Sequence, residues 1–290
     1  MLPSRHNRLK QELKKAFGII LSMTISLSCA NASDKITIEG AVSQFGEAIQ
    51  GGLIIAQLNQ GARASLDGTP LPISASGYVA FGFHRDDQDT ILLEITHDSG
   101  EIYQTKITPQ IREYKTQSIS GLAKKYVSPP QETLDRIARD RDAVISARAH
   151  LSYEDDFAKS GFDWPAKGII TGVYGSQRIL NGQPRAPHYG IDIAAAKGTP
   201  VLAPADGIIT MADDLYYTGG TIIIDHGLNI SSTMLHLESM SLSVGDIVKR
   251  GQVIGTVGSS GRSTGPHLDW RINWQQKRLD PQLALTLFDD

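Results

Sequence analysis

Cysteine is nearly absent from this sequence of 290 residues, which contains only Cys29. A single cysteine can form neither an intrachain disulfide nor a thiolate zinc cluster, so any metal centre must use other side chains. An excess of positive charge is also lacking, because 28 Lys and Arg residues stand against 31 Asp and Glu residues. This balance makes nucleic acid or an anionic membrane surface an unsuitable partner.

Long hydrophobic runs are missing at the N-terminus, where the apolar stretch covers only residues 16–27. That is well short of the ~20 residues that cross a bilayer. Five basic residues precede the stretch and Ala30-Asn31-Ala32 follows it, which is the pattern of an export signal cleaved after Ala32. We therefore expect a periplasmic or secreted protein with no membrane span after cleavage. An uncleaved anchor, or a lipoprotein modified at Cys29, are the alternatives.

Cleavage would make the protein more acidic. Residues 1–32 carry five basic residues and one acidic residue, so the formal charge of −3 becomes −7 without them. Such a charge further disfavours binding to nucleic acid.

Residues 33–118 contain short β-like segments separated by turns, which predicts a small β-sandwich domain. Polar and apolar residues alternate over 35–39, which predicts a first strand there. Asp67-Gly68 predicts a hairpin turn. His84 and His97 lie in this region without metal-ligand neighbours, so we expect surface or structural roles for both.

Residues 119–160 predict a helical connector. Ser128-Pro129-Pro130 ends the β pattern, and apolar residues then recur at helical spacing over residues 131–150. The remaining faces of this helix are charged, and His150 at its end is expected to be exposed.

Residues 161–290 return to a β pattern rich in glycine, and they contain a set of histidines and aspartates. His188 and Asp192 lie four residues apart. Far downstream, His267 and Asp269 flank one leucine, and His236 lies between the two groups. His and Asp side chains that converge from distant segments can form a zinc site with nitrogen and oxygen ligands.

Five sequence blocks follow one another across roughly residues 164–282. They are Trp164-Pro165 with Gly168-Ile169-Ile170; His188-x3-Asp192; Gly198-Thr199-Pro200-Val201; His236-Leu237 with Val244-Gly245-Asp246; and Gly261-x-Ser263-Thr264-Gly265-Pro266-His267-Leu268. In this order they resemble the LytM/lysostaphin-type zinc metallopeptidases. The resemblance implies a mainly β protein in which a barrel-sandwich-like peptidase domain, residues 161–290, follows the β-sandwich and the connector.

The resemblance also implies roles for individual residues. His188, Asp192 and Asp269 take the positions of the zinc ligands, and His236 and His267 take the catalytic positions. The implied function is zinc-dependent hydrolysis of the peptide cross-links of peptidoglycan by metal-activated water, so peptidoglycan stem peptides are the expected partner. A divisome or cell-wall enzyme that binds the N-terminal domain is a further expected partner.

Asp269 departs from the family pattern, which has histidine at this position. An aspartate is a competent zinc ligand, but a second carboxylate lowers the net positive charge of the site and is expected to make its water less acidic. The departure leaves a second interpretation open, in which the domain is a degenerate regulator that binds and activates cell-wall amidases. His226 is expected to be structural, although it is the spare histidine that could replace the missing one.

Other residues have weaker assignments. Trp270 and Trp274 alternate with polar residues and are expected in the core. Gly251-Gln252-Val253-Ile254-Gly255 resembles half of a lipoyl or biotinyl carrier domain, but no Met-Lys-Met turn accompanies it. Residues that could line a substrate groove are Arg178, Tyr189, Tyr217, Ser263 and Thr264.

Overall fold

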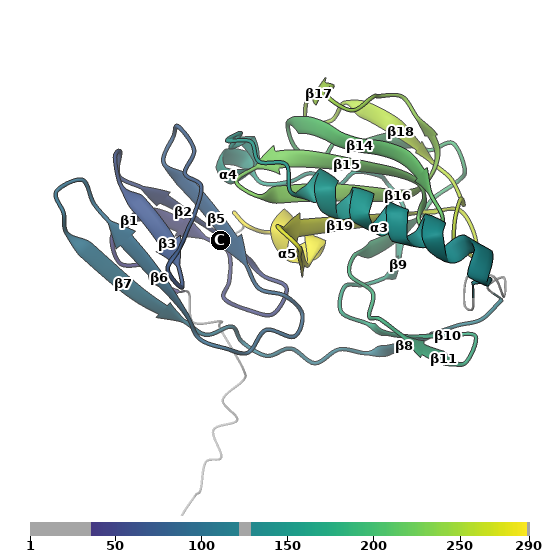
Figure 1. Ribbon diagram of the computed structural model, residues 1–290, viewed down its shortest axis with the longest axis horizontal. Coiled ribbons are helices and arrows are strands. Elements are labelled where there is room, and N and C mark those ends of the chain that lie inside the picture. The colour runs from purple at the N-terminus through teal and green to yellow at the C-terminus, as the bar shows by residue number, and fades with distance from the viewer. Residues whose placement is uncertain (1–35, 122–128, 289–290) are drawn as a thin grey trace, which may run out of the picture. The chain divides into compact units, whose positions relative to one another are not determined.

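The computed structural model describes residues 36–121 and 129–288, so the expected export signal lies outside the described residues. These described residues belong to one compact unit. The protein is mainly β, as the sequence predicts, and Figure 1 shows the arrangement of its strands and helices. Within the described ranges, no helix has the length and apolar character needed to cross a membrane.

The first seven strands form two antiparallel sheets, a three-stranded one in the order β1-β2-β5 and a four-stranded one in the order β4-β3-β6-β7. Their buried faces carry the apolar residues that alternate along each strand, such as Leu93 and Ile95. The strands are β1 (Ala41–Phe45), β2 (Leu53–Leu58), β3 (Arg63–Leu66), β4 (Thr69–Pro70), β5 (Tyr78–Gly82), β6 (Ile91–Thr96) and β7 (Ile102–Ile107).

The prediction of a strand at residues 35–39 is wrong for residues 36–39, which are the part of this range that the structure describes, because β1 begins at Ala41. Ile38 is buried, but its backbone N–H donates to the side chain of Gln44 at 2.7 Å instead of to a neighbouring strand. The alternation over residues 35–39 therefore reflects the burial of Ile38 and not a strand. The predicted hairpin turn is confirmed, since Asp67 and Gly68 have φ values of 48° and 77° between β3 and β4.

A ten-stranded sheet makes up most of the second half of the chain. Its main path runs β17-β14-β15-β16-β19-β12-β9, and the neighbours on this path are antiparallel. The strands are β9 (Ile169–Gly172), β12 (Ile191–Ala194), β13 (Pro200–Leu202), β14 (Gly207–Leu215), β15 (Gly219–Gly227), β16 (Ile230–Met240), β17 (Ile247–Val248), β18 (Val253–Val257), β19 (His267–Trp274) and β20 (Lys277–Leu279).

The two faces of β19 separate the core from the site. Leu268, Trp270 and Ile272 have no exposed surface and lie in the core. Successive strand residues point to opposite faces, so Asp269 and Arg271 share the other face. The prediction that Trp270 lies in the core is confirmed.

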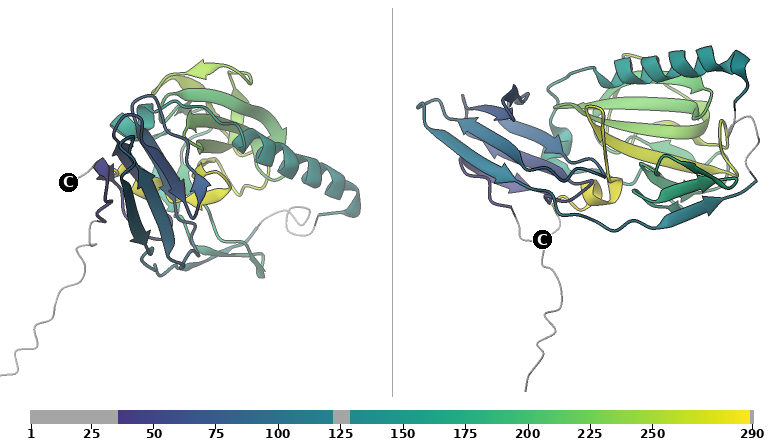
Figure 2. Two further views of the ribbon diagram at one scale, coloured as in Figure 1. Left: turned by 60° about the vertical axis from the view of Figure 1, so that its left-hand side comes forward. Right: turned by 60° about the horizontal axis from the view of Figure 1, so that its bottom comes forward.

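The predicted helix appears as a 3₁₀ turn, η1 (Gln131–Thr133), followed by α3 (Leu134–Arg148). Val144 and Ala147 of α3 pack against Met211, Leu215 and Ile223 of the sheet. Figure 2 shows the helix lying across this face in both views. Two short helices, α4 (Asp156–Ser160) and α5 (Pro281–Leu285), complete the helical content of the described residues.

A three-stranded sheet of its own lies beside the site. β8 (Thr116–Ile119) pairs in parallel with β10 (Gln177–Leu180), which pairs with β11 (Gln183–Arg185). The segment after the N-terminal sheets therefore meets the loop that leads to His188.

Candidate metal centre

Two carboxylates face each other across adjacent strands. Asp192 on β12 and Asp269 on β19 are direct partners in the antiparallel register. Side chains at such positions are separated by only about 4.5–5.5 Å at Cβ, so the two acids are forced together. His188 lies three residues before β12, where its backbone exchanges hydrogen bonds with Gly175 and Ser176.

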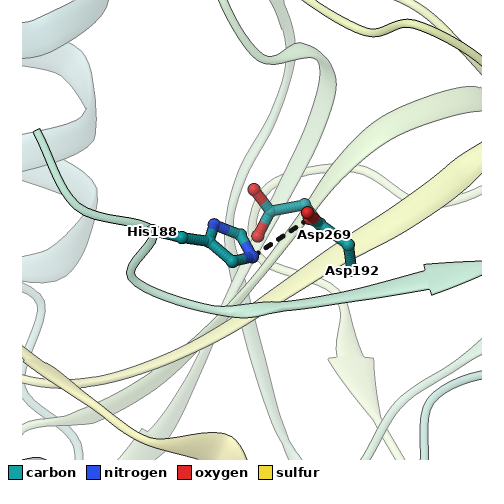
Figure 3. Close-up of side chains that lie close together, drawn as sticks. All are labelled: His188, Asp192 and Asp269. Carbon is teal, nitrogen blue, oxygen red and sulfur yellow. Dashed lines mark ion pairs between the residues drawn. The ribbon is translucent and has the colours of Figure 1, made fainter. Parts of the chain in front are cut away.

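Together, His188, Asp192 and Asp269 form a group in which the potential ligand atoms all lie within 4.8 Å of one another. His188 Nε2 is 3.1 Å from Asp192 Oδ1 (Figure 3). All three residues are buried. The structure thus brings together the three residues that the sequence analysis placed at the ligand positions.

His188 is the clearest sign that the site suits a metal. Its side chain is fully buried, yet neither ring nitrogen has a hydrogen-bond partner of suitable geometry among the described residues, and the same holds for Asp192 Oδ1. Buried polar atoms without partners are costly. A cation bound between Nε2 and the two carboxylates would satisfy Nε2 and Asp192 Oδ1, and one imidazole with two carboxylates is a donor set that zinc accepts.

Each carboxylate is also paired with an arginine. Arg178 Nη2 donates to Asp192 Oδ2 at 2.6 Å. Arg271 binds Asp269 in a bidentate manner, with Nε–Oδ1 at 2.9 Å and Nη2–Oδ2 at 2.6 Å. The sequence analysis did not identify Arg271, although its position two residues after Asp269 on a strand puts both on one face.

These neighbours keep both acids ionised. Burial alone would raise the pKa of Asp192, but His188 and Arg178 outweigh it and the pKa lies below its usual value. Burial alone would also raise the pKa of Asp269. The charge of Arg271, followed by that of His188, outweighs this effect and holds the pKa far below the usual range. Both groups are therefore anionic at neutral pH, as metal ligands must be.

His236 and His267 lie side by side, with ring centroids 4.8 Å apart. Nδ1 of His236 lies 2.8 Å from the carbonyl oxygen of Ser260, and Nδ1 of His267 lies 2.9 Å from that of Gly265. A carbonyl oxygen only accepts, so each Nδ1 carries a proton, and in the neutral form of each ring the lone pair is on Nε2. His267 Nε2 is 3.7 Å from Asp192 Oδ1, which places it beside the ligand group.

The backbone of β16 is unusual at His236, which has a φ of 65°. Its neighbour Leu235 pairs with Asp269, and the register to the adjacent strands shifts around this point. Residues other than glycine rarely adopt this conformation, and such outliers concentrate at functional sites. Burial lowers the pKa of His236 to about 4, so its ring is neutral at neutral pH.

Two glycines leave space for the carboxylates. A Cβ at Gly172 would lie 2.3 Å from Asp192 Oδ2, and a Cβ at Gly190 would lie 2.6 Å from Asp269 Oδ1. Any side chain at either position would displace an acid from its present place.

A cavity of about 320 Å³ opens at this group and includes Asp192, His236 and His267 in its lining. Arg178, Ser263 and Thr264 line it as predicted. Tyr189 and Tyr217 are not among its lining residues: Tyr189 packs against His84, and the Tyr217 ring lies 4.8 Å from the Arg262 guanidinium. The lining also contains Gln117, Ile119 and Arg262, which the sequence analysis did not find.

The other histidines have separate positions. His226 is buried, with Nδ1 2.7 Å from the carbonyl oxygen of Asp206 and Nε2 2.7 Å from Ser232 Oγ. His97 Nε2 lies 2.8 Å from the carbonyl oxygen of Gly40. His150 is partly exposed and pairs with Asp225 at 2.7 Å. In the described parts of the chain, none of these joins a group suited to a metal.

The part of the sequence that contains this site is similar to a known protein family. The model of peptidase family M23 matches residues 186–281. Residues 186–281, which contain all five residues of the site, are thus similar to peptidase family M23.

Curated proteins are similar to part of this chain. The chain is 48% identical over 90 residues to the DD-carboxypeptidase/endopeptidase Mpg of Neisseria meningitidis, covering 30% of this chain and 21% of that protein. It is 41% identical over 87 residues to the peptidoglycan DD-endopeptidase ShyA of Vibrio cholerae, covering 30% of this chain and 20% of that protein. The chain thus spans only about a fifth of the length of these relatives.

The likeness in fold extends beyond the M23 domain. The structure of a candidate M23 peptidase from Pseudomonas aeruginosa matches with a TM-score of 0.65 and 24% identity. The match covers 83% of this chain and 96% of that chain. The two proteins therefore share a fold that includes most of the region before the M23 domain.

Proposed function

We propose that this protein is a zinc-dependent endopeptidase that hydrolyses peptide cross-links of peptidoglycan. The observation that carries the proposal is the buried group of His188, Asp192 and Asp269 beside two histidines, His236 and His267, whose Nδ1 atoms bond to backbone carbonyls. The names of the curated relatives, which are peptidoglycan endopeptidases, support this substrate class. The proposal includes export through residues 1–32 and domain limits at residues 33–118, 119–160 and 161–290.

Zinc would be held by His188, Asp192 and Asp269. When bound, it supplies Lewis-acid polarisation of a carbonyl and an acidic water at neutral pH. Arg178 binds Oδ2 of Asp192 and can fix the orientation of that ligand. Arg271 instead occupies both oxygens of Asp269, so it would have to release at least one of them to the metal.

His236 and His267 are the proton-transfer groups of this proposal. Each ring is fixed by its Nδ1–H bond to a backbone carbonyl, so each Nε2 faces the cavity as a base. The neutral state of His236 suits it to accept a proton, and the resulting imidazolium can return that proton to the leaving amine. Once protonated at Nε2, either ring can donate a hydrogen bond to the oxyanion that forms at the scissile carbonyl.

The cavity has features suited to a peptide with acidic groups. Arg262 contributes a positive charge to its lining, and Ser263 and Thr264 contribute hydroxyl groups. Gln117 and Ile119 come from β8, so the segment that follows the N-terminal sheets forms part of the wall. We propose that this segment helps to position the stem peptide.

The proposal is tested by incubating the purified protein with cross-linked peptidoglycan and reading the muropeptides by mass spectrometry. Cross-linked dimers should decrease and the matching monomers should appear, with added zinc increasing the rate and a chelator abolishing it. His188→Ala is the matched inactive control, and Arg139→Met, on the exposed face of α3, is the control for mutation itself. Cleavage that persists in chelator and in His188→Ala would refute a metal-dependent reaction at this site.

A second function is favoured by one observation. Both oxygens of Asp269 already accept hydrogen bonds from Arg271, so the carboxylate has a cationic partner without a metal. A metal-free domain that activates cell-wall amidases would fit this arrangement. In the same assay, a folded protein that binds no zinc and cleaves nothing, but accelerates an added amidase, would establish this function instead.

A further inference from the structure

A second cavity, of about 410 Å³, lies between helix α3 and the sheet. Four arginines line it, Arg141, Arg148, Arg271 and Arg278, and Asp140 is the single acidic residue in the lining. Asp140 is engaged elsewhere, because its Oδ2 accepts a hydrogen bond from the backbone of Tyr216 at 2.7 Å. Arg141 pairs with Asp142 and Arg271 with Asp269, so Arg148 and Arg278 are the cations of this lining that have no carboxylate partner among the described residues.

Arg148 is the residue that most needs a partner. It is only 7% exposed, although it ends a surface helix, and within residues 36–121 and 129–288 its Nε has no hydrogen-bond partner. Burial lowers the pKa of its guanidinium well below the usual value, and the nearby charges of Arg278 and Arg271 lower it further. A buried guanidinium among other guanidinium groups is unfavourable unless an anion compensates it.

Two further cations of the lining, the partly buried Arg271 and Arg278, are held in place by polar neighbours. Arg278 Nη1 donates to Asn273 Oδ1 at 2.5 Å, and Asn273 in turn donates to Ser231 and Thr233 on β16. Arg271 is fixed by its bidentate bond to Asp269. Positively charged groups are thus preorganised around one cavity, which lowers the cost of binding an anion.

The remaining lining limits the kind of anion. Thr218, Thr221 and Thr233 add hydroxyl groups, whereas Ile137, Val144 and Leu235 add apolar surface. Guanidinium groups bind oxyanions such as phosphate and carboxylate through paired N–H donors.

We propose that this cavity is a binding site for a small oxyanion, a phosphate or a carboxylate group, contacted by Arg148, Arg271 and Arg278. The site does not include His188 or Asp192, and it shares Arg271 and Leu235 with the surroundings of Asp269. The proposal therefore stands or falls independently of the peptidase activity.

Isothermal titration calorimetry tests the proposal with the purified protein freed of metal, so that no anion can bind through zinc. One titration uses inorganic phosphate and a second uses hexanoate, which combines a carboxylate with an apolar tail. We expect saturable binding of at least one of them with a stoichiometry of one. The arm that shows binding identifies the chemical source of the oxyanion.

Arg148→Met is the decisive variant, because Arg148 contacts neither the ligand group nor the cavity that contains it. Loss of one charged donor should weaken binding by roughly tenfold or more, and Arg148→Lys should restore part of it. Arg139→Met, an exposed arginine of the same helix, should bind as the wild type does. Circular dichroism and thermal melting confirm that each variant is folded.

Two results would overturn the proposal. One is the absence of saturable binding of both anions to the wild-type protein. The other is binding that is equally strong in the folded Arg148→Met variant, which would place the anion elsewhere. If Arg148→Met does not fold, the partial loss expected for Arg278→Lys provides the same comparison.

Discussion

Replacement of Arg271 by methionine separates the two partners that compete for Asp269. In the wild type, Arg271 donates two hydrogen bonds to a carboxylate that is only 1% exposed. Methionine keeps much of the side-chain volume but removes the charge, so Asp269 is left as a buried anion without its counter-ion. The change therefore destabilises the metal-free protein while it frees the carboxylate for a metal.

The size of the effect follows from the burial of the pair. Removal of one partner from a buried ion pair costs about 3–5 kcal/mol of unfolding free energy. For a unit of this size, that cost corresponds to a fall in Tm of roughly 6–20 °C. Zinc supplies the missing positive charge, so we expect zinc to bind roughly tenfold more tightly to Arg271→Met than to the wild type, a difference of about 1.4 kcal/mol.

Equilibrium unfolding by urea, with a chelator and with saturating zinc, measures both effects. The variant should be less stable than the wild type in chelator, and its gain on addition of zinc should exceed that of the wild type. Arg139→Met should change the unfolding free energy by no more than about 0.5 kcal/mol in either condition. Equal gains from zinc in Arg271→Met and the wild type would refute the idea that Arg271 and the metal compete for Asp269.

Three further predictions concern Asp269 and single histidines. Asp269→Ala should abolish stoichiometric zinc in metal analysis and with it peptidoglycan hydrolysis; retention of both would remove Asp269 from the ligand set. His236→Gln and His267→Gln should retain zinc but hydrolyse roughly 10²–10⁴-fold more slowly, because a proton-transfer group is lost; loss of zinc instead would make these histidines ligands. His226→Gln should retain zinc. Burial lowers the pKa of His226 in the folded protein, so the unfolded chain binds more protons. The wild type should therefore lose stability as the pH falls below about 6.5. Urea titrations should find a smaller loss of stability in His226→Gln.

The residues of the candidate site could be named from the sequence because they lie in short, ordered motifs. Spacing along β12 and β19 places Asp192 and Asp269 on strands, and the register then brings them opposite each other. Arg271 could have been found by the same period of two, since a long cation two residues from a buried acid on one strand face has that acid within reach.

Contacts between distant segments could not be predicted in this way. Gln117 and Ile119 reach the cavity through the parallel pairing of β8 with β10, and nothing in the local sequence of either strand specifies that partner. The buried state of Arg148 has the same origin, because the charged pattern of α3 suggests a solvated surface and only the packing of this helix against the sheet buries the residue. Long-range packing overrides local pattern at both places.

The strand predicted at residues 35–39 failed for a related reason. Alternation of polar and apolar residues reports which side chains are buried, and Ile38 is indeed buried. It does not report which partner satisfies the backbone, and here the side chain of Gln44 takes that role. The alternation therefore predicts the burial of Ile38 correctly, but its prediction of strand hydrogen bonds at this residue is wrong.

The central claim is that His188, Asp192 and Asp269 hold a metal ion. The most direct test is X-ray diffraction from crystals grown with zinc, with data collected above and below the zinc absorption edge. We expect one anomalous peak that disappears below the edge, at about 2.0–2.2 Å from His188 and from an oxygen of each aspartate. An anomalous map without a peak between these three residues, with Arg271 still bound to Asp269, would contradict the account.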